Sequence, residues 1–156
     1  CLNCDGGIMM NLQELQTVDE YRLPIKIFIF NNDGYLMIKH TQKNLFKGNY
    51  VAVNKKTKIS CPNLKKLADT FNMKYYKIEN WKNFDKKIEI INKIKTPLIC
   101  EVLMDPEQFF HPKLGTSMGK NGKIISPPLE DLSPLINREK LQKNMIIPMH
   151  KKSKII

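Results

Sequence analysis

The sequence predicts an α/β fold in which a parallel sheet has helices on both faces. Short apolar runs that suit buried strands alternate with segments whose apolar residues recur every three or four positions, as on amphipathic helices. Beyond residue 104 this alternation stops and prolines become frequent. We therefore expect an α/β domain over residues 1–104 and an extended tail over residues 105–156 that wraps the domain or a partner.

Two strands joined by a helix are expected in the first part of the chain. Residues 1–4 resemble the end of a strand, and residues 11–22 place apolar side chains on one helical face. The apolar run at residues 25–30 suits a buried parallel strand. Asn-Asn-Asp-Gly at residues 31–34 is a strong turn signal, and a short helix is expected from residue 35 to about residue 42.

The following part of the chain repeats this alternation. Residues 43–62 are expected to form an irregular surface segment. A helix over residues 63–72 precedes a short strand over residues 74–78, and a second helix over residues 84–95 precedes a buried strand over residues 97–103. Such alternation favours a parallel sheet with right-handed crossover connections.

The charge of the chain does not predict a nucleic-acid-binding surface. The formal net charge is +11, but the 24 lysines are spread along the chain and there are only 2 arginines. Dispersed lysine is typical of a solvated surface, whereas nucleic-acid binding requires a clustered basic patch. Apolar runs such as Ile27–Phe30 are too short to span a bilayer, and no signal-peptide pattern is present. We expect a cytoplasmic protein that binds neither nucleic acid nor membrane.

The cysteines raise an alternative interpretation. Cys1 and Cys4 form a C-x-x-C pair, a spacing found in zinc sites and redox centres. Zinc would require two further ligands at matching spacing, and Cys61 and Cys100 stand alone. We expect buried thiols in a reducing cytoplasm, with the metal or redox site as the alternative.

Two motifs at the ends of successive strands predict a site for a phosphate group. Asp5-Gly6-Gly7 follows the first strand; its glycines let backbone amides approach a ligand, and the next helix directs its N-terminus at the same place. Asn32 lies 27 residues after Asp5, about the length of one βαβ unit. If the two strands are neighbours, both motifs lie at the edge where open α/β sheets bind ligands.

The residue types at this edge predict a magnesium ion. A carboxylate, an amide oxygen and a backbone carbonyl are hard oxygen ligands, and with two phosphate oxygens and a water they complete the octahedron that Mg²⁺ prefers. Each motif alone is typical of an ordinary turn. Their pairing across one βαβ unit is what favours an ion held between Asp5 and Asn32.

At these residues the sequence resembles the thiamine-diphosphate-binding motif, in which Gly-Asp-Gly is followed, after nearly thirty residues, by Asn-Asn. The likeness extends over Cys4–Thr17, Leu23–Phe28 and Asn31–Tyr35. These segments resemble the C-terminal cofactor domain of acetolactate synthase and its relatives. The tail segments Pro128–Asp131 and Asn144–Ile147 resemble a subgroup of that family.

The resemblance implies the cofactors and a role for each matching residue. Thiamine diphosphate and Mg²⁺ are implied, with Asp5 and Asn32 as side-chain ligands of the metal and Gly34 as a ligand through its carbonyl. The residues implied to offer backbone groups to the diphosphate are Gly6, Gly7, Tyr35 and Leu36.

Two methionines are implied to line the site. Met10 would pack near the pyrimidine ring of the cofactor, and Met37 would lie near the substrate pocket. Both are equally suited, as flexible apolar side chains, to filling the core. The three histidines have no partner at ligand spacing and receive no role.

The chain departs from the family pattern in two respects. Cys4 stands where the family has its first glycine, so its side chain either crowds the diphosphate or points into the core. The glutamate that activates the cofactor belongs, in the family, to a separate N-terminal domain, for which this chain has no counterpart. The chain also begins at Cys1 inside a motif, so we expect an N-terminally truncated fragment of a longer protein.

The resemblance therefore implies the thiamine-diphosphate- and Mg-binding portion of an acetolactate synthase-like enzyme, inactive alone, that acts on 2-oxo acids by decarboxylation and carboligation. The alternative is a non-catalytic remnant or a split cofactor-binding subunit of a 2-oxo acid decarboxylase. The implied partners are a small-molecule 2-oxo acid and either further copies of the full-length protein, as a dimer or tetramer, or a separate pyrimidine-binding subunit.

Overall fold

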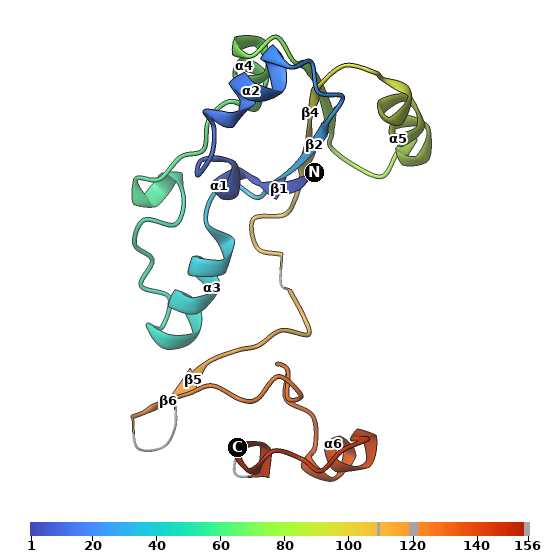
Figure 1. The fold of residues 1–156 in the computed structure, drawn as a ribbon. Coiled ribbons are helices and arrows are strands. Elements are labelled where there is room, and N and C mark those ends of the chain that lie inside the picture. The colour runs from blue at the N-terminus through green and yellow to red at the C-terminus, as the bar shows by residue number, and fades with distance from the viewer. Residues whose placement is uncertain (109, 119–121, 155–156) are drawn as a thin grey trace. The chain divides into compact units, whose positions relative to one another are not determined.

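A parallel four-stranded sheet organises the first part of the chain, as the sequence predicts (Figure 1). The computed structural model describes residues 1–108, 110–118 and 122–154. The strands are β1 (Leu2–Cys4), β2 (Lys26–Asn31), β3 (Lys74–Ile78) and β4 (Leu98–Leu103), in the order β1-β2-β4-β3. All neighbours are parallel, so the carboxyl ends of the strands meet at one edge.

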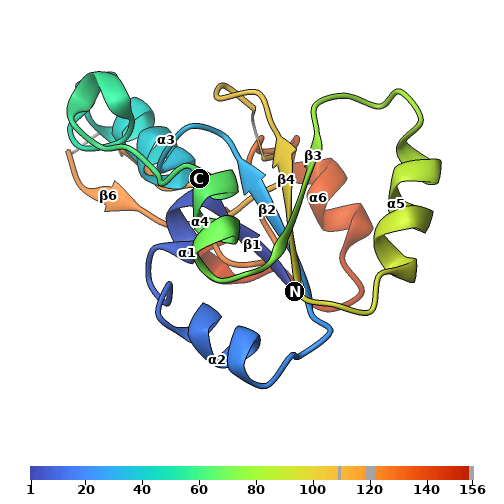
Figure 2. The same cartoon turned by 90° about the horizontal axis from the view of Figure 1, so that it is seen from above.

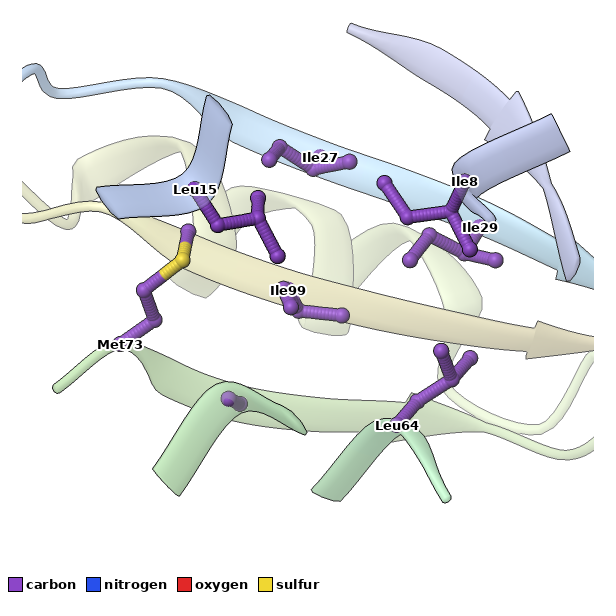
Figure 3. Close-up of a cluster of buried hydrophobic side chains, with 8 residues drawn as sticks. Ile8, Leu15, Ile27, Ile29, Leu64, Met73 and Ile99 are labelled. Carbon is purple, nitrogen blue, oxygen red and sulfur yellow. The ribbon is translucent and has the colours of Figure 1, made fainter. Parts of the chain in front are cut away.

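One face of the sheet is covered by three short helices, α1 (Asp5–Ile8), α2 (Glu14–Glu20) and α4 (Leu64–Thr70). Side chains from these helices pack on isoleucines that β2 and β4 direct to this face (Figure 3). The buried members of this cluster are Ile8, Leu15, Ile27, Ile29, Leu64, Ala68, Met73 and Ile99.

The opposite face is covered by α5 (Phe84–Lys93), which lies on the other side of the strands (Figure 2). Ile91 of this helix packs with Ile78, Leu98 and Cys100 of the sheet. Side chains alternate between faces along a strand, so Ile99 joins the first cluster while Leu98 and Cys100 join the second. The predicted parallel sheet with helices on both faces is confirmed.

Several predicted boundaries are wrong. The helix expected over residues 11–22 begins at Glu14, because residues 9–13 form successive turns closed by i to i−3 hydrogen bonds such as Met10 N to Gly7 O at 3.1 Å. The helix expected to end near residue 42 continues as α3 (Leu36–Leu45). The segment 43–62 is not only a surface segment, since Val53 is buried and a 3-10 turn spans Lys55–Thr57.

The chain divides into two compact units, residues 1–38 with 51–108 and residues 39–50 with 109–156. The second unit contains an antiparallel pair, β5 (Ser117–Met118) with β6 (Ile124–Ile125), then α6 (Arg138–Asn144) and a 3-10 turn over Lys151–Lys154. The region expected to be an extended tail therefore has regular elements of its own. Across the described residues, no helix combines the length and apolar character that crossing a bilayer requires.

A partly buried ion pair ties the segment before α6 to its first turn. The Arg138 guanidinium donates to both carboxylate oxygens of Asp131, at 2.5 and 2.9 Å, and Asp131 is 1% exposed. Arg138 also donates to the carbonyl of Ser153 at 3.1 Å. The prolines in this unit prevent long helices, and charge-assisted hydrogen bonds hold its short elements instead.

Candidate functional site

Asp5 lies at the carboxyl end of β1, where the strand ends and α1 begins. Its side chain is 1% exposed and accepts hydrogen bonds from three backbone N–H groups. Gly6 N donates to Oδ1 at 2.8 Å, while Asn32 N and Gly34 N donate to Oδ2 at 3.1 and 3.0 Å. The carboxylate thus joins the ends of β1 and β2, as the βαβ spacing predicts.

The turn after β2 contains two residues with positive φ, a backbone conformation that few residue types adopt. Asp33 has φ 62° and Gly34 has φ 141°. A Cβ on Gly34 would lie 2.1 Å from the carbonyl oxygen of Val53, and Gly34 forms an isolated β-bridge with Asn54. Glycine is required here both by φ and by this close approach. The buried segment around Val53 therefore braces the turn, which the sequence did not indicate.

Asn32 has the one unsatisfied buried side-chain atom found in the described part of the chain. Its Oδ1 is buried without a hydrogen-bond partner among the described residues, and the residue is 9% exposed. An unpaired buried amide oxygen costs free energy unless a ligand satisfies it. The backbone N–H of Asn32 contacts the Asp5 carboxylate, and an amide oxygen together with a carboxylate is a donor set that fits a hard cation such as Mg²⁺.

Gly6 is required for a reason other than access to a ligand. A Cβ there would lie 2.3 Å from Cε1 of the Tyr35 ring, so the ring occupies the space above this buried glycine. Its N–H donates to Asp5 Oδ1, and the N–H of Tyr35 donates to the Val53 carbonyl at 2.8 Å. Both amides expected to meet the diphosphate are therefore engaged within the protein.

The space over Gly7, another expected diphosphate contact, is occupied by neighbouring side chains, and Leu36 is the last of these contacts. Gly7 is half-buried, and a Cβ there would lie 2.3 Å from Asn3 Oδ1 and 3.0 Å from Cys4 Sγ. Leu36 begins α3, and the first N–H groups of a helix have no partner within it. The helix expected to direct its N-terminus at Asp5-Gly6-Gly7 instead starts at Asp5 itself and is one turn long.

Met10 and Met37 are not core residues. Their exposed fractions are 75% and 56%, respectively. Both follow site residues closely, Met10 after α1 and Met37 in the first turn of α3. Their exposure excludes the alternative that they fill the core.

The cysteines differ from the expectation of buried thiols. Cys1 and Cys4 are exposed, whereas Cys100 is fully buried. Burial, together with the charges of Asp5 and Asp33, raises the pKa of the Cys61 thiol to about 11. Cys61 thus lies beside the Asp5 carboxylate as a protonated thiol at neutral pH, a neighbour that the sequence did not reveal.

The C-x-x-C pair does not assemble a metal centre in the described part of the chain. There, no group of three or more His, Cys, Asp or Glu side chains is arranged to hold a metal ion. The exposed Cys4 thiol lies over Gly7, where a Cβ would be 3.0 Å from its sulfur.

A polar pocket of about 570 Å³ opens beside the Asn31–Gly34 turn. It lies at the carboxyl ends of β2, β3 and β4, next to the start of α4. The side chains that line it include Asn31, Cys61, Asn63, Tyr75, Lys77 and Glu101. Glu101 and Tyr75 were not singled out from the sequence, because each lies within a predicted strand rather than at the end of one.

Comparisons with known proteins agree with this geometry. Residues 1–102 match the family model "Thiamine pyrophosphate enzyme, C-terminal TPP binding domain". The chain is 30% identical over 140 residues to the acetolactate synthase large subunit of Porphyra purpurea, covering 88% of this chain and 23% of the relative. It is 28% identical over 132 residues to the Haemophilus influenzae acetolactate synthase large subunit, covering 84% and 22%. The chain thus spans less than a quarter of the length of these relatives.

Proposed function

The chain belongs to the thiamine pyrophosphate enzyme family, as its C-terminal TPP-binding domain, and from this premise we propose that it holds the cofactor diphosphate through a Mg²⁺ bound by Asp5 and Asn32. The observation that carries the proposal is the buried Oδ1 of Asn32, which has no hydrogen-bond partner among the described residues and belongs to a residue whose backbone N–H donates to the Asp5 carboxylate. A cation at this place would satisfy the amide oxygen.

The hydrogen bonds of Asp5 support its role as a ligand. Oδ2 accepts from two backbone N–H groups, while Oδ1 accepts from Gly6 N. A carboxylate has about four lone-pair sites, so Oδ1 retains a lone pair for a metal while Oδ2 anchors the turn. Gly34 would add its backbone carbonyl, and the phosphate oxygens of the cofactor would supply further hard ligands.

The diphosphate contacts are proposed for fewer amides than the family pattern implies. The N–H groups of Gly7 and Leu36 would donate to phosphate oxygens, because those of Gly6 and Tyr35 already have acceptors within the chain. The start of α3 would add the favourable end of its helix dipole to the same anion. Met10 and Met37 would contact the pyrimidine ring and the substrate.

The reaction is proposed from the relatives. When bound, thiamine diphosphate supplies the carbanion chemistry by which such enzymes act on 2-oxo acids. We propose a role in decarboxylation and carboligation of 2-oxo acids, in concert with a pyrimidine-binding domain contributed by the full-length protein as a dimer or tetramer, or by a separate subunit. The residues of this chain would bind and orient the diphosphate end.

Calorimetric titration with thiamine diphosphate in the presence and absence of Mg²⁺ tests the proposal. We expect binding that requires Mg²⁺, and at least about tenfold weaker binding for Asn32→Ala. The matched control is Asn92→Ala on the exposed side of α5, which should bind as the wild type does. An absence of Mg²⁺-dependent binding by the wild-type chain, or equal binding by Asn32→Ala, would overturn the proposal.

A second candidate function, a non-catalytic remnant, is favoured by Cys4. Its exposed thiol lies over Gly7, where the diphosphate would approach, and the family has glycine at this position. If the thiol excludes the cofactor, Cys4→Gly should bind thiamine diphosphate and Mg²⁺ where the wild type does not. Cofactor binding by both the wild type and Cys4→Gly supports the first function. Cofactor binding by neither protein supports the remnant.

A further inference from the structure

We propose that Glu101 is a positioning residue for the metal-binding turn: its carboxylate fixes the side-chain amide of Asn31 and, through it, the backbone that presents Asn32. This inference rests on the proposed function for its consequence, but its geometry is internal to the chain. Glu101 lies on β4, a central strand of the sheet, and is 9% exposed.

The sheet face covered by α1, α2 and α4 changes from apolar to polar side chains toward the carboxyl ends of the strands. Along β2 this face presents Ile27, Ile29 and then Asn31, and along β4 it presents Ile99 and then Glu101. The apolar rows therefore end in a polar pair. A largely buried carboxylate on a central strand is costly unless hydrogen bonds replace its lost hydration, so its partners are expected to be specific.

Two donors meet the Glu101 carboxylate, one on each oxygen. The Tyr75 hydroxyl donates to Oε2, and the Asn31 side-chain N–H donates to Oε1 at 2.5 Å. Burial and the hydrogen bond to Glu101 raise the pKa of the Tyr75 phenol far above its usual value, so the hydroxyl remains a donor at neutral pH. Tyr75 and Asn31 thus hold the carboxylate from two neighbouring strands.

The contact with Glu101 determines which way the Asn31 amide points. An ionised carboxylate only accepts hydrogen bonds, so the NH₂ end of Asn31 must face it and Oδ1 must face away. That oxygen accepts the backbone N–H of Asp33 at 3.0 Å, closing an Asx turn around Asn32. Asp33 is held there with φ 62°, and the next N–H, of Gly34, reaches Asp5.

Glu101 therefore acts on the proposed metal site through a relay of two hydrogen bonds. Without an acceptor at position 101, the Asn31 amide can rotate or flip, and the Asp33 N–H loses its partner. The segment that presents Asn32 would then keep the bonds from Asn32 N and Gly34 N to Asp5 and the brace at Gly34, but would lose the bond that fixes the Asp33 N–H. Metal affinity would fall because the amide oxygen of Asn32 would no longer be held in one place.

Amide hydrogen exchange of the ligand-free protein, resolved by NMR, tests the relay directly. In Glu101→Leu we expect the Asp33 N–H to exchange at least about fivefold faster, since one net hydrogen bond contributes a factor of that order. The N–H groups of Asn32 and Gly34 should keep their protection, because Asp5 holds them. Glu101→Gln should restore the wild-type rate at Asp33, since its carbonyl can accept from Asn31.

The matched control is Tyr75→Phe, which removes the other donor to Glu101 and leaves the contact with Asn31 in place. It should leave the Asp33 exchange rate unchanged. The inference is overturned if Glu101→Leu leaves that rate at the wild-type value. It is equally overturned if Tyr75→Phe accelerates Asp33 as much as Glu101→Leu does, because the effect would then be general loosening of the strands.

A double-mutant cycle on Mg²⁺-dependent thiamine diphosphate binding tests the consequence. Glu101→Leu should raise the Mg²⁺ concentration at half-saturation by about tenfold, but by less than about twofold in an Asn31→Ala background, because residues that act through one another are not additive. Equal effects in both backgrounds would overturn the relay. If the wild-type chain does not bind the cofactor, the proposed function fails, while the exchange rates of the ligand-free protein still decide the role of Glu101.

Discussion

Replacing Asp5 by asparagine should destabilise the ligand-free domain, because this carboxylate is a structural acceptor as well as a proposed metal ligand. Three backbone N–H groups donate to it, from Gly6, Asn32 and Gly34 at 2.8, 3.1 and 3.0 Å. An asparagine can place its single oxygen toward the two N–H groups at Oδ2, which leaves its NH₂ facing the N–H of Gly6. One buried donor then loses its acceptor, which costs about 2 kcal/mol of unfolding free energy.

Urea denaturation followed by circular dichroism measures this loss, and the melting temperature should fall by about 4–8 °C, since 1 kcal/mol corresponds to about 2–4 °C in a chain of this length. Asp33→Asn is the matched control: the same chemical change at an exposed residue whose φ of 62° asparagine also tolerates. It should change the unfolding free energy by no more than about 0.5 kcal/mol. Equal stability of the two variants would refute the reasoning that Asp5 holds the ends of β1 and β2 together.

Three further outcomes are expected. Burial and the bond to Glu101 favour the protonated form of Tyr75 in the folded state and raise its pKa, so the unfolding free energy should fall as pH rises above about 10. Urea denaturation at pH 8 and 10.5 should show a smaller fall in unfolding free energy for Tyr75→Phe than for the wild type. Iodoacetamide should modify the exposed Cys1 and Cys4 before Cys100, whose burial raises its pKa to about 11; mass spectrometry reports the order, and early labelling of Cys100 would contradict its burial. Gly34→Ala should lower the unfolding free energy by about 3 kcal/mol, because alanine is strained at φ 141° and its Cβ would lie 2.1 Å from the Val53 carbonyl oxygen. An unchanged midpoint of urea denaturation would contradict that clash.

The parts of the fold that the sequence predicted correctly depend on local patterns. The short, β-branched apolar runs of β2 and β4 favoured buried strands, and the length of one βαβ unit predicted that Asp5 lies next to the turn after β2. The parallel arrangement then follows from the alternation of strands and helices. Such features are encoded within short stretches of sequence, so they can be recognised without knowledge of distant contacts.

The features that the sequence did not reveal depend on contacts between distant residues. Asn31 and Glu101 are 70 positions apart, and nothing near either residue indicates that they meet. The brace that Val53 provides to Gly34 arises from a segment whose composition indicates only an irregular surface loop. The helix predicted over residues 11–22 was wrong at its start because the turns after α1 compete locally with continuous helix, and an apolar stripe cannot distinguish the two.

The unpartnered oxygen of Asn32 also bears on how tightly a cation could bind. Removing a polar atom from water is costly, and for this oxygen that cost is met when the chain folds. A cation that arrives at the folded domain encounters a donor that is already dehydrated and already fixed between Asn31 and Asp33. Less of the binding free energy is then needed to remove water from the oxygen and to order the protein around it. The folded domain is somewhat less stable without the cation, but its site is pre-organised for binding.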